Sequence, residues 1–542
     1  MKAINKLVLL SFSILVGANA ALFADDFGSF DDFGSFGDET SATSKLEVNG
    51  RAALELRAYG DLSEVEEPSI KDVEVSAIPK AKLDLKYNGA KSDVSLSLKV
   101  DEDSIKNHPI DIIDEAVLRG YFGDFTLEAG KMKVVWGKGD KLHVLDNFNA
   151  DDYSDFIIPD YIDRRLSIPM LRAVYNAGFA NLQLEGIYAP LLTSDRFATS
   201  GRWTPVQYTS LTQGATKIVS ANLLGLEHKA AAAEAALQQA ALAADKAYLE
   251  YLTYANDLSS NPDSLYPDLW NLKYSQYGLR VLGTAGTFDF GASYYCGWYK
   301  QPSVNYSAYI ESVESMQLQI ASAPTTLGAA YMSLVSSGKS ESEALQSLAV
   351  ANGWQFALPT LDYDRKQTFG IEAATVLWHF NVRGEAAYNL TEDFDGTNPW
   401  VHNNSVAWLC GFDIDLPFWN ANLNVQETGT LILNGNECDD NNKKYAAYNA
   451  SDVDYSENGY TNNKIVANLT TSFLNDKITP EVTVMYGIEN RDLIVLPKLS
   501  YKPDQNLTLT ASGMYIWCGR DTSEFKAWEN NSFVSLGASY QF

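Results

Sequence analysis

Residues 81–88 read Ala-Lys-Leu-Asp-Leu-Lys-Tyr-Asn, so that apolar and polar side chains alternate strictly along the segment. Residues 94–101, Val-Ser-Leu-Ser-Leu-Lys-Val-Asp, repeat this alternation. A repeat of two residues is typical of a β-strand whose two faces meet different surroundings. In a soluble sandwich the apolar face would cover a core, whereas in a membrane barrel it would face lipid and leave a polar lumen inside.

The links between such segments distinguish these two folds, because membrane barrels have short turns on one side of the bilayer and longer loops on the other. From Lys45 the alternation continues almost to the end of the chain. Tight links interrupt it at residues 88–91, 123–124, 176–178, 284–286, 377–379, 417–420, 474–477 and 502–506. Longer links lie between these, and among them only the link at 489–492 is short. The chain therefore reads as a series of hairpins with two different ends.

We predict an all-β fold for residues 45–542, namely a transmembrane antiparallel up-and-down β-barrel of about 18 strands, within a range of roughly 14–18. Two long outer loops, residues 189–273 and 299–366, contain helical segments in this prediction. Residues 228–252 are rich in Ala without Gly or Pro, and residues 309–351 hold a second helical stretch that Pro324 breaks.

The N-terminus has the features of an exported chain. Residues 1–20 read as a signal peptide with a positive start, a short apolar stretch and a small-residue cleavage site, and an alternative cut follows Ala24. Residues 25–44 begin with an acidic tandem repeat of Asp-Asp-Phe-Gly-Ser-Phe, for which we expect a disordered tether. A docking peptide in the periplasm is the alternative. We therefore expect localisation in the outer membrane, with the lipid bilayer as a partner.

Composition limits the function classes. Beyond the signal peptide there is no run of about 18 consecutive apolar residues, which excludes a helical membrane protein. Aromatic residues make up 12% of the chain, as expected where rings gather at two membrane interfaces. The net charge of −28 argues against nucleic-acid binding, which requires a basic face.

The last segment of the sequence carries a specific local signal. Residues 534, 536, 538, 540 and 542 are apolar or aromatic, and the residues between them are polar or Gly. The segment resembles the terminal strand that outer-membrane barrels present to the barrel assembly machinery. We therefore assign Tyr540 and Phe542 as an assembly signal, and the assembly machinery as a partner.

The segment from Asp114 to Tyr175 contains a spaced set of motifs. These are Glu128-Ala129-Gly130-Lys131, Trp136-Gly137, Asp146-Asn147-Phe148-Asn149, Asp151-Asp152-Tyr153, Asp163-Arg164-Arg165 and Ile168-Pro169-Met170-Leu171-Arg172. The segment resembles a family of porin-like outer-membrane barrels that carries a domain-of-unknown-function label, although that family has three residues between the Pro and the Arg where this chain has two. Residues 369–372 and 383–388 are a second similarity. The resemblance implies a porin-like barrel and names no solute.

Strand alternation also predicts which charged residues face the lumen. The predicted lining set is Arg51, Glu55, Arg57, Lys82, Asp84, Lys86, Lys99, Glu115, Arg119, Glu128, Glu185, Arg383 and Glu385. Its charges nearly balance, so the excess acid of the chain falls mainly in the loops and the tether. A mixed lumen suits a water-filled pore with a transverse field, and an acidic mouth predicts a modest preference for cations. Alternatively, these side chains pair across strands and fill the interior.

The strongest candidate for a constriction is the loop of residues 137–165, which is rich in charges of both signs and in aromatic residues. If it folds inward, Asp151, Asp152, Arg164 and Arg165 would line the passage. An outward loop is the alternative, and it would leave the constriction to residues of the wall.

Catalytic and metal-binding motifs are absent from the sequence. It has only five His residues, and we find neither His-Glu-x-x-His nor Gly-x-Ser-x-Gly. We therefore expect no enzyme, no cofactor and no metal site. The four Cys residues, at positions 296, 410, 438 and 518, are too sparse for a disulfide scaffold. The sequence does not decide whether they form one or two disulfides in the loops.

The sequence thus favours a porin-like channel for passive diffusion of small solutes. An importer of hydrophobic compounds, plugged by the N-terminal segment, and a surface adhesin or receptor are the alternatives. The sequence does not decide whether the chain forms a homo-oligomer.

Overall fold

The computed structural model describes residues 45–60, 73–140, 142–178, 181–205, 218–226, 228–229, 267–437, 459–521 and 523–542. Within them, eighteen strands form one sheet in which neighbours along the chain pair antiparallel. They are β1 (Lys45–Tyr59), β2 (Glu74–Asn88), β3 (Ser92–Val100), β4 (Ile113–Phe122), β5 (Phe125–Met132), β7 (Ile168–Ala177), β8 (Leu182–Ala189), β10 (Gln276–Ala285), β11 (Phe288–Trp298), β14 (Arg365–Leu377), β15 (Phe380–Leu390), β16 (Ser405–Asp415), β17 (Asn422–Ile432), β18 (Thr461–Thr470), β19 (Ile478–Gly487), β20 (Asp492–Tyr501), β21 (Leu507–Cys518) and β22 (Phe533–Gln541).

The sheet closes into a barrel because its first and last strands pair with each other. β1 pairs with β22 from Arg51 opposite Gln541 to Tyr59 opposite Phe533. Beyond the strand, Phe542 exchanges two backbone hydrogen bonds with Gly50, of 2.8 and 2.9 Å. A closed sheet has no free edge, which is the condition for a β-structure that crosses lipid.

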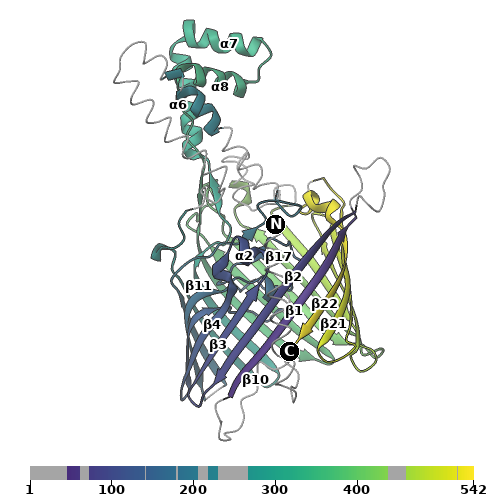
Figure 1. Cartoon of the computed structure of the whole chain (residues 1–542). Helices are drawn as coiled ribbons and strands as arrows, with labels where there is room; N and C mark the ends of the chain where they lie inside the picture. Colours follow the sequence, from purple (N-terminus) through teal and green to yellow (C-terminus); the bar gives the residue numbers. More distant parts are fainter. Residues whose placement is uncertain are drawn as a thin grey trace.

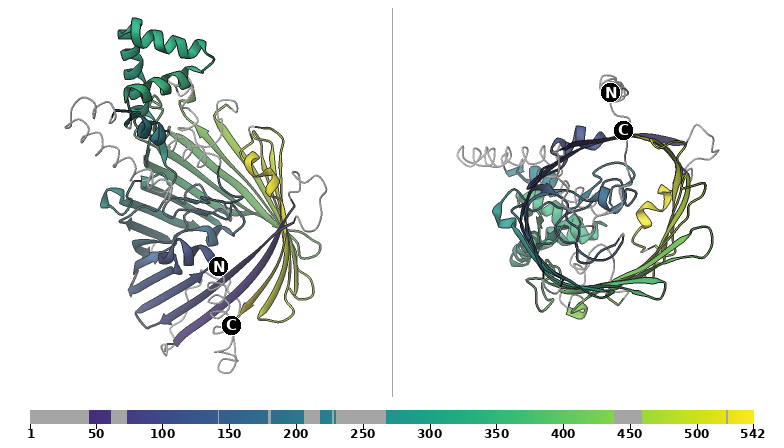
Figure 2. Two further views of the ribbon diagram at one scale, coloured as in Figure 1. Left: turned by 45° about the horizontal axis from the view of Figure 1, so that its top comes forward. Right: turned by 90° about the horizontal axis from the view of Figure 1, so that it is seen from below.

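The predicted barrel of 18 antiparallel strands is confirmed. The tight links that the sequence predicts join β2 to β3, β4 to β5 and the following alternate pairs, so they lie together at one end of the barrel. The longer links lie at the other end, and the helices α6 (Ser307–Ser322), α7 (Ala329–Ser336) and α8 (Glu341–Asn352) lie beyond it (Figure 1). Seen along its axis, the barrel is a closed ring with several chain segments inside it (Figure 2).

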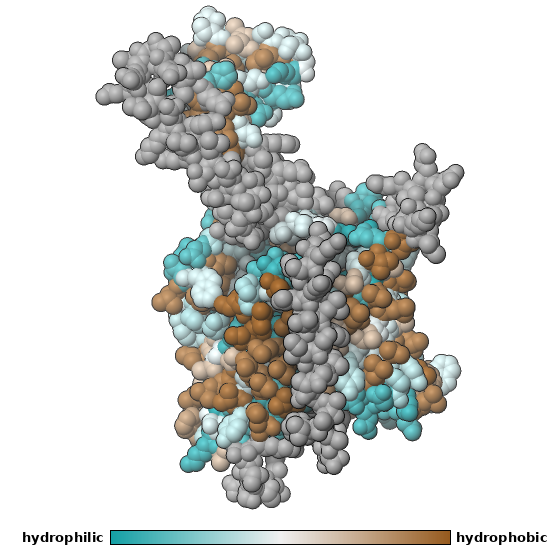
Figure 3. All heavy atoms as spheres, in the orientation of Figure 1, coloured by the Kyte–Doolittle hydropathy of each residue, from teal (hydrophilic) through white to brown (hydrophobic). Residues whose placement is uncertain are grey.

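Apolar side chains cover the outside of the barrel. Leu171, Leu279, Ile371 and Leu536 point outward and are 56–66% exposed, as expected of residues that would contact lipid. Figure 3 shows apolar residues gathered over the middle of the visible wall and hydrophilic ones toward its two ends. Both faces of the alternating strands therefore have the character that the sequence predicts.

Strand β2 is longer than the alternation suggested. The strict pattern begins at Ala81, but the strand begins at Glu74 and includes Pro79, which pairs opposite Leu54. Proline is unusual inside a sheet because it cannot donate a backbone hydrogen bond, and its position makes the sequence look like a strand end. The longer strand adds Lys80 to the inward face.

Helices occur in the link between β11 and β14. They are α6 (Ser307–Ser322), the π-helix η5 (Pro324–Gly328), α7 (Ala329–Ser336) and α8 (Glu341–Asn352). The segments on either side of them pair as a small sheet of β12 (Ser303–Asn305) and β13 (Thr360–Asp362). The break in this helical stretch falls at Pro324. The other predicted helix, residues 228–252, lies outside the described residues apart from positions 228 and 229.

The helices of residues 307–352, which we call the helical hairpin, have a core of their own, separate from the barrel. Met316, Ile320, Leu345 and Leu348 are buried between its helices. The Asn222 side chain donates to the backbone oxygen of Phe356 and accepts from its N–H, each at 2.8 Å. In the described part of the chain, no helix has the length and apolarity required to cross a bilayer.

Candidate functional site

The link between β5 and β7 folds into the barrel rather than away from it. Trp136, Leu145 and Phe148 of this link are each 1% exposed. They pack against inward side chains of the wall, including Tyr295 of β11 and Ala407 of β16. The Phe148 ring meets the Trp136 and Tyr295 rings edge-on, with both centroids 5.2 Å away. We call residues 133–167 the inner loop.

One end of the inner loop is fixed to the wall by Glu385 of β15. Its carboxylate accepts backbone N–H groups from Lys138 and Gly139 at 2.7 Å and from Val144 at 2.9 Å. The carboxylate is fully buried. A Cβ at Gly137, where φ is +117°, would lie 2.3 Å from Oε1 of Glu385. The Gly of the Trp-Gly motif thus allows the loop to approach this carboxylate.

The other end of the inner loop is held by its own polar residues. Arg165 is buried and ion-paired with Asp146 at 2.7 Å and with Asp151 at 3.6 Å. The Asn149 side chain accepts the Val134 N–H at 2.9 Å and donates to the backbone oxygens of Met132 and Leu166 at 3.0 and 2.8 Å. Asp146 and Asn149 of the Asp-x-x-Asn motif therefore shape the loop and do not line the lumen.

A second segment, residues 190–205, also enters the barrel. Its strand β9 (Arg196–Phe197) pairs in parallel with β6 (Asp152–Tyr153) of the inner loop. The Arg196 guanidinium binds Asp111 at 2.6 Å, Asp152 at 3.2 Å and Asp103 at 3.4 Å. Trp203 stacks on Phe156 with ring centroids 5.0 Å apart. The prediction of an outer loop over residues 189–273 is therefore wrong for this segment, whose one short strand gives no periodic signal in the sequence.

Beneath the inner loop, inward-facing charges of the wall pair with one another. The ladder crosses β4, β5, β7, β8, β10 and β14 in the order Arg119, Glu128, Arg172, Glu185, Arg280 and Glu372, with successive separations of 2.5, 2.9, 2.6, 3.9 and 2.7 Å. Trp136 of the inner loop lies over Arg280, whose guanidinium carbon is 5.8 Å from the ring centroid. On this side of the barrel the charged side chains therefore pair across strands and fill the interior, which is the alternative to a water-filled lumen.

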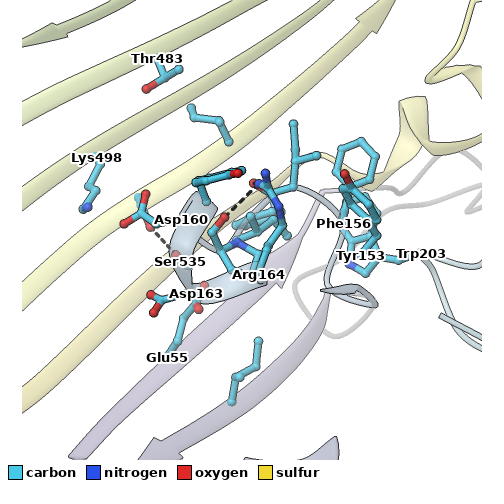
Figure 4. A pocket seen from close by; sticks show the side chains of 18 of the residues that line it. Glu55, Tyr153, Phe156, Asp160, Asp163, Arg164, Trp203, Thr483, Lys498 and Ser535 are labelled. Atoms are coloured by element: carbon cyan, nitrogen blue, oxygen red, sulfur yellow. Dashed lines mark hydrogen bonds between the residues drawn. The ribbon is translucent and has the colours of Figure 1, made fainter. Parts of the chain in front are cut away.

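The other side of the lumen holds a cavity of about 770 Å³. Its wall is formed by β1 to β3 and β17 to β22, and its remaining side by the inner loop and Trp203. Figure 4 shows Asp160, Asp163 and Arg164 on the loop side, with Thr483 and Lys498 on the strands across from them. Acids and bases therefore face each other across the cavity, an arrangement that gives a pore a transverse field.

The predicted lining residues fall into four groups. Arg51, Glu55, Lys82 and Lys99 line the cavity. Arg119, Glu128 and Glu185 belong to the ladder. Arg57 binds Asp155, and Glu115 accepts the N–H of Lys133. Arg383 binds Asp140 and Asp413, and Glu385 binds the inner loop. Asp84 and Lys86 share the inward face of β2 but lie nearer the end with the short turns.

Of the four constriction candidates, only Arg164 lines the cavity. It donates to the backbone oxygens of Pro159 and Ile157 at 3.2 and 3.4 Å. Asp151, Asp152 and Arg165 stand behind the lining in the ion pairs described above. Acidic residues of the short helix α3 (Tyr161–Arg164) and its N-cap, Asp163 and Asp160, occupy the lining instead.

Sequence reasoning missed further lining and ladder residues. Lys80, Lys464, Glu481, Lys498 and Glu524 line the cavity, and Arg172, Arg280 and Glu372 complete the ladder. Strand alternation could have identified all of them except Glu524, which lies in the link between β21 and β22. Lys80 lies before the strict alternation that begins at Ala81, although the strand itself begins at Glu74.

Titratable groups in and beside the inward segments have shifted pKa values. Burial, followed by the nearby charge of Asp151, raises the pKa of Asp195 to about 6. The Asp195 carboxylate accepts the Asp151 N–H at 2.9 Å, so it joins the segment of residues 190–205 to the inner loop. By contrast, a hydrogen bond from His108 lowers the pKa of Asp103 to about 2.

No metal-binding cluster of three or more His, Cys, Asp or Glu residues occurs within the described ranges. Cys296, Cys410 and Cys518 are free thiols on three separate strands. The described cysteines thus form no disulfide with one another, and Cys438 lies outside the described residues.

Comparison with known proteins gives similar solved structures but no family model. No family model and no curated protein matches the chain, so the resemblance of residues 114–175 stays a prediction. The outer membrane channel DcaP of Acinetobacter baumannii matches 93% of this chain and 99% of its own at 11% identity, with a TM-score of 0.37. A BenF-like porin from Pseudomonas fluorescens Pf-5 matches 92% and 98% at 8% identity, with a TM-score of 0.41. OccK11 (OpdR) of Pseudomonas aeruginosa matches 92% and 96% at 6% identity, with a TM-score of 0.40.

Proposed function

We propose that this chain is an outer-membrane channel through which small hydrophilic or amphiphilic solutes diffuse passively. The observation that carries the proposal is the charged cavity of about 770 Å³ inside a closed sheet whose outer face is apolar. On β22 its lining runs from Phe533 near the end with the longer links to Ser539 near the end with the short turns. Polar groups along this path replace part of the hydration that a solute loses on entry.

The same proposal places the chain in the membrane. Residues 1–20 act as the signal peptide and residues 25–44 as an acidic tether, and both lie outside the described residues. The short turns face the periplasm, and the longer links and the helical hairpin face the cell exterior. Tyr540 and Phe542 serve as the signal for the barrel assembly machinery. The proposal assigns the chain no catalytic activity, and it is compatible with a homo-oligomer.

The lining argues against import of purely hydrophobic compounds. Arg51, Glu55, Lys82 and Lys498 all line the cavity, and a hydrophobic solute would have to displace their hydration without replacing it. The helical hairpin is the observation that favours the other candidate, a surface adhesin or receptor. It stands outside the barrel with its own buried core, so it can act beside a channel and need not replace it.

Purified protein in planar lipid bilayers tests the channel. We expect stable steps of ionic conductance from protein that shows the heat-modifiable migration of a folded barrel. Folded protein that stays silent and binds fatty acids tightly would contradict the proposal and favour the importer.

A further inference from the structure

The cavity contains a cluster of basic side chains on three neighbouring strands. Arg51 of β1 lies directly opposite Lys82 of β2, and Lys82 lies directly opposite Lys99 of β3. Lys80 follows on the same face of β2, and all four residues line the cavity. Directly opposed residues have Cβ atoms about 5 Å apart, and like charges in that position destabilise a sheet.

Acidic neighbours offset only part of this charge. Lys99 binds Asp101 at 3.3 Å, and Lys82 lies 3.7 Å from Asp114 and 3.9 Å from Asp84. Arg51 and Lys80 have no ion-pair partner anywhere in the described part of the chain. The ladder beneath the inner loop shows the contrast, because each of its bases binds at least one carboxylate. The basic cluster is therefore a place where an anion would relieve repulsion between the bases.

Above the cluster, toward the end with the longer links, the cavity is aromatic. Phe156, Trp203, Phe525 and Phe533 line it there, and Trp203 packs against Tyr59, the last residue of β1. A solute that enters from this end meets flat apolar surfaces before it reaches the bases. Rings of this kind bind apolar bodies and tolerate many shapes.

We propose that the channel selects small organic anions with an apolar body, and that Arg51, Lys80, Lys82 and Lys99 bind their anionic group. This inference rests on the proposed channel function and adds the class of solute. It replaces the cation preference expected from the acidic outer links, because the cavity lining has more bases than acids while the outer acids are exposed to screening by salt.

Block of the ionic current by three probes tests the inference at about 0.1 M KCl, where the Debye length is about 10 Å. The probes are 2-naphthoate, its uncharged analogue 2-naphthamide, and acetate, which has the charge without the rings. We expect 2-naphthoate to block at a lower concentration than either of the others. Equal block by 2-naphthoate and 2-naphthamide would overturn the inference, whereas an absence of any KCl current would overturn the channel function itself.

Single substitutions then locate the binding group. Arg51→Gln and Lys80→Gln should each weaken block by 2-naphthoate about fivefold, the effect of one charge contact at about 4 Å in water. Block by 2-naphthamide should not change. Removal of a like charge relieves repulsion, so folding should be preserved. The matched controls are Lys91→Gln and Lys502→Gln, which remove exposed bases from the short turns. Equal weakening in the variants and in these controls would show that overall charge, and not this cluster, attracts the anion.

Discussion

At the scale of single residues, Glu385 determines where the inner loop lies. Three backbone N–H groups of the loop donate to this one buried carboxylate. Glu385→Gln places an amide NH₂ among these donors, and hydrogen bonds to a charged acceptor contribute about 1.5–3 kcal/mol each. We therefore expect the hydrogen bonds that hold this end of the loop to be weaker by about 3 kcal/mol in total.

Open-channel current noise and proteolysis within residues 138–147 measure this loosening, and both should increase in the Glu385→Gln variant. Glu392→Gln is the control, since it removes the same charge from an exposed position shortly after β15. If the Glu385→Gln variant had the same current noise and the same protease resistance as the control, the loop would be held by its apolar packing alone.

At the scale of elements, the junction between the inner loop and residues 190–205 depends on protonation. Burial and the charge of Asp151 raise the pKa of Asp195 to about 6, above the value of about 3.9 for an unfolded chain. A raised carboxyl pKa means that the folded junction binds the proton more tightly. Proton binding at Asp195 therefore stabilises the junction. This stabilisation is fully present below about pH 4 and is lost as the pH rises through about 6.

Hydrogen-exchange protection of residues 195–197, corrected for the intrinsic rate, should therefore fall between pH 4 and pH 7. Asp195→Asn should show a smaller fall. The difference between the two proteins separates the effect of Asp195 from that of the nearby Lys300 amine, whose pKa is lowered by burial. Protection that rises with pH in the wild type, relative to the variant, would contradict the assigned direction.

Part of this arrangement can be predicted from the sequence. Strand alternation and link length are local properties, so the barrel, its hairpins and the inward parity of Glu128 and Glu385 follow from the sequence alone. Alternation cannot show that Glu128 joins a ladder while Glu385 binds a loop more than 240 positions away. It also cannot show that Arg165 turns away from the cavity toward Asp146 while Asp160 enters the lining.

At the scale of the whole molecule, the barrel closes through the pairing of β1 with β22, and Gly50 and Phe542 contact each other at one end of this seam. A Cβ at Gly50 would lie 2.3 Å from the Phe542 ring. Gly50→Val should therefore destabilise the barrel by about 1–3 kcal/mol, the usual cost of overpacking. The urea midpoint of the heat-modifiable form measures it. Phe542→Ala in the same chain should remove most of this cost, and Gly178→Val, at a glycine with open space, is the control. An equal cost with and without the Phe542 ring would contradict this account of closure.

We place the path of the solutes between the inner loop and the wall formed by β17 to β22 and β1 to β3. Thr510 of β21 lines this cavity, and its neighbour Leu509 points outward and is 40% exposed. With the four native cysteines replaced by serine, Thr510→Cys and Leu509→Cys can each be treated with a charged methanethiosulfonate during bilayer recording. We predict that conductance falls for Thr510→Cys and stays constant for Leu509→Cys. Unchanged conductance in a Thr510→Cys protein that mass spectrometry shows to be labelled would contradict the claim.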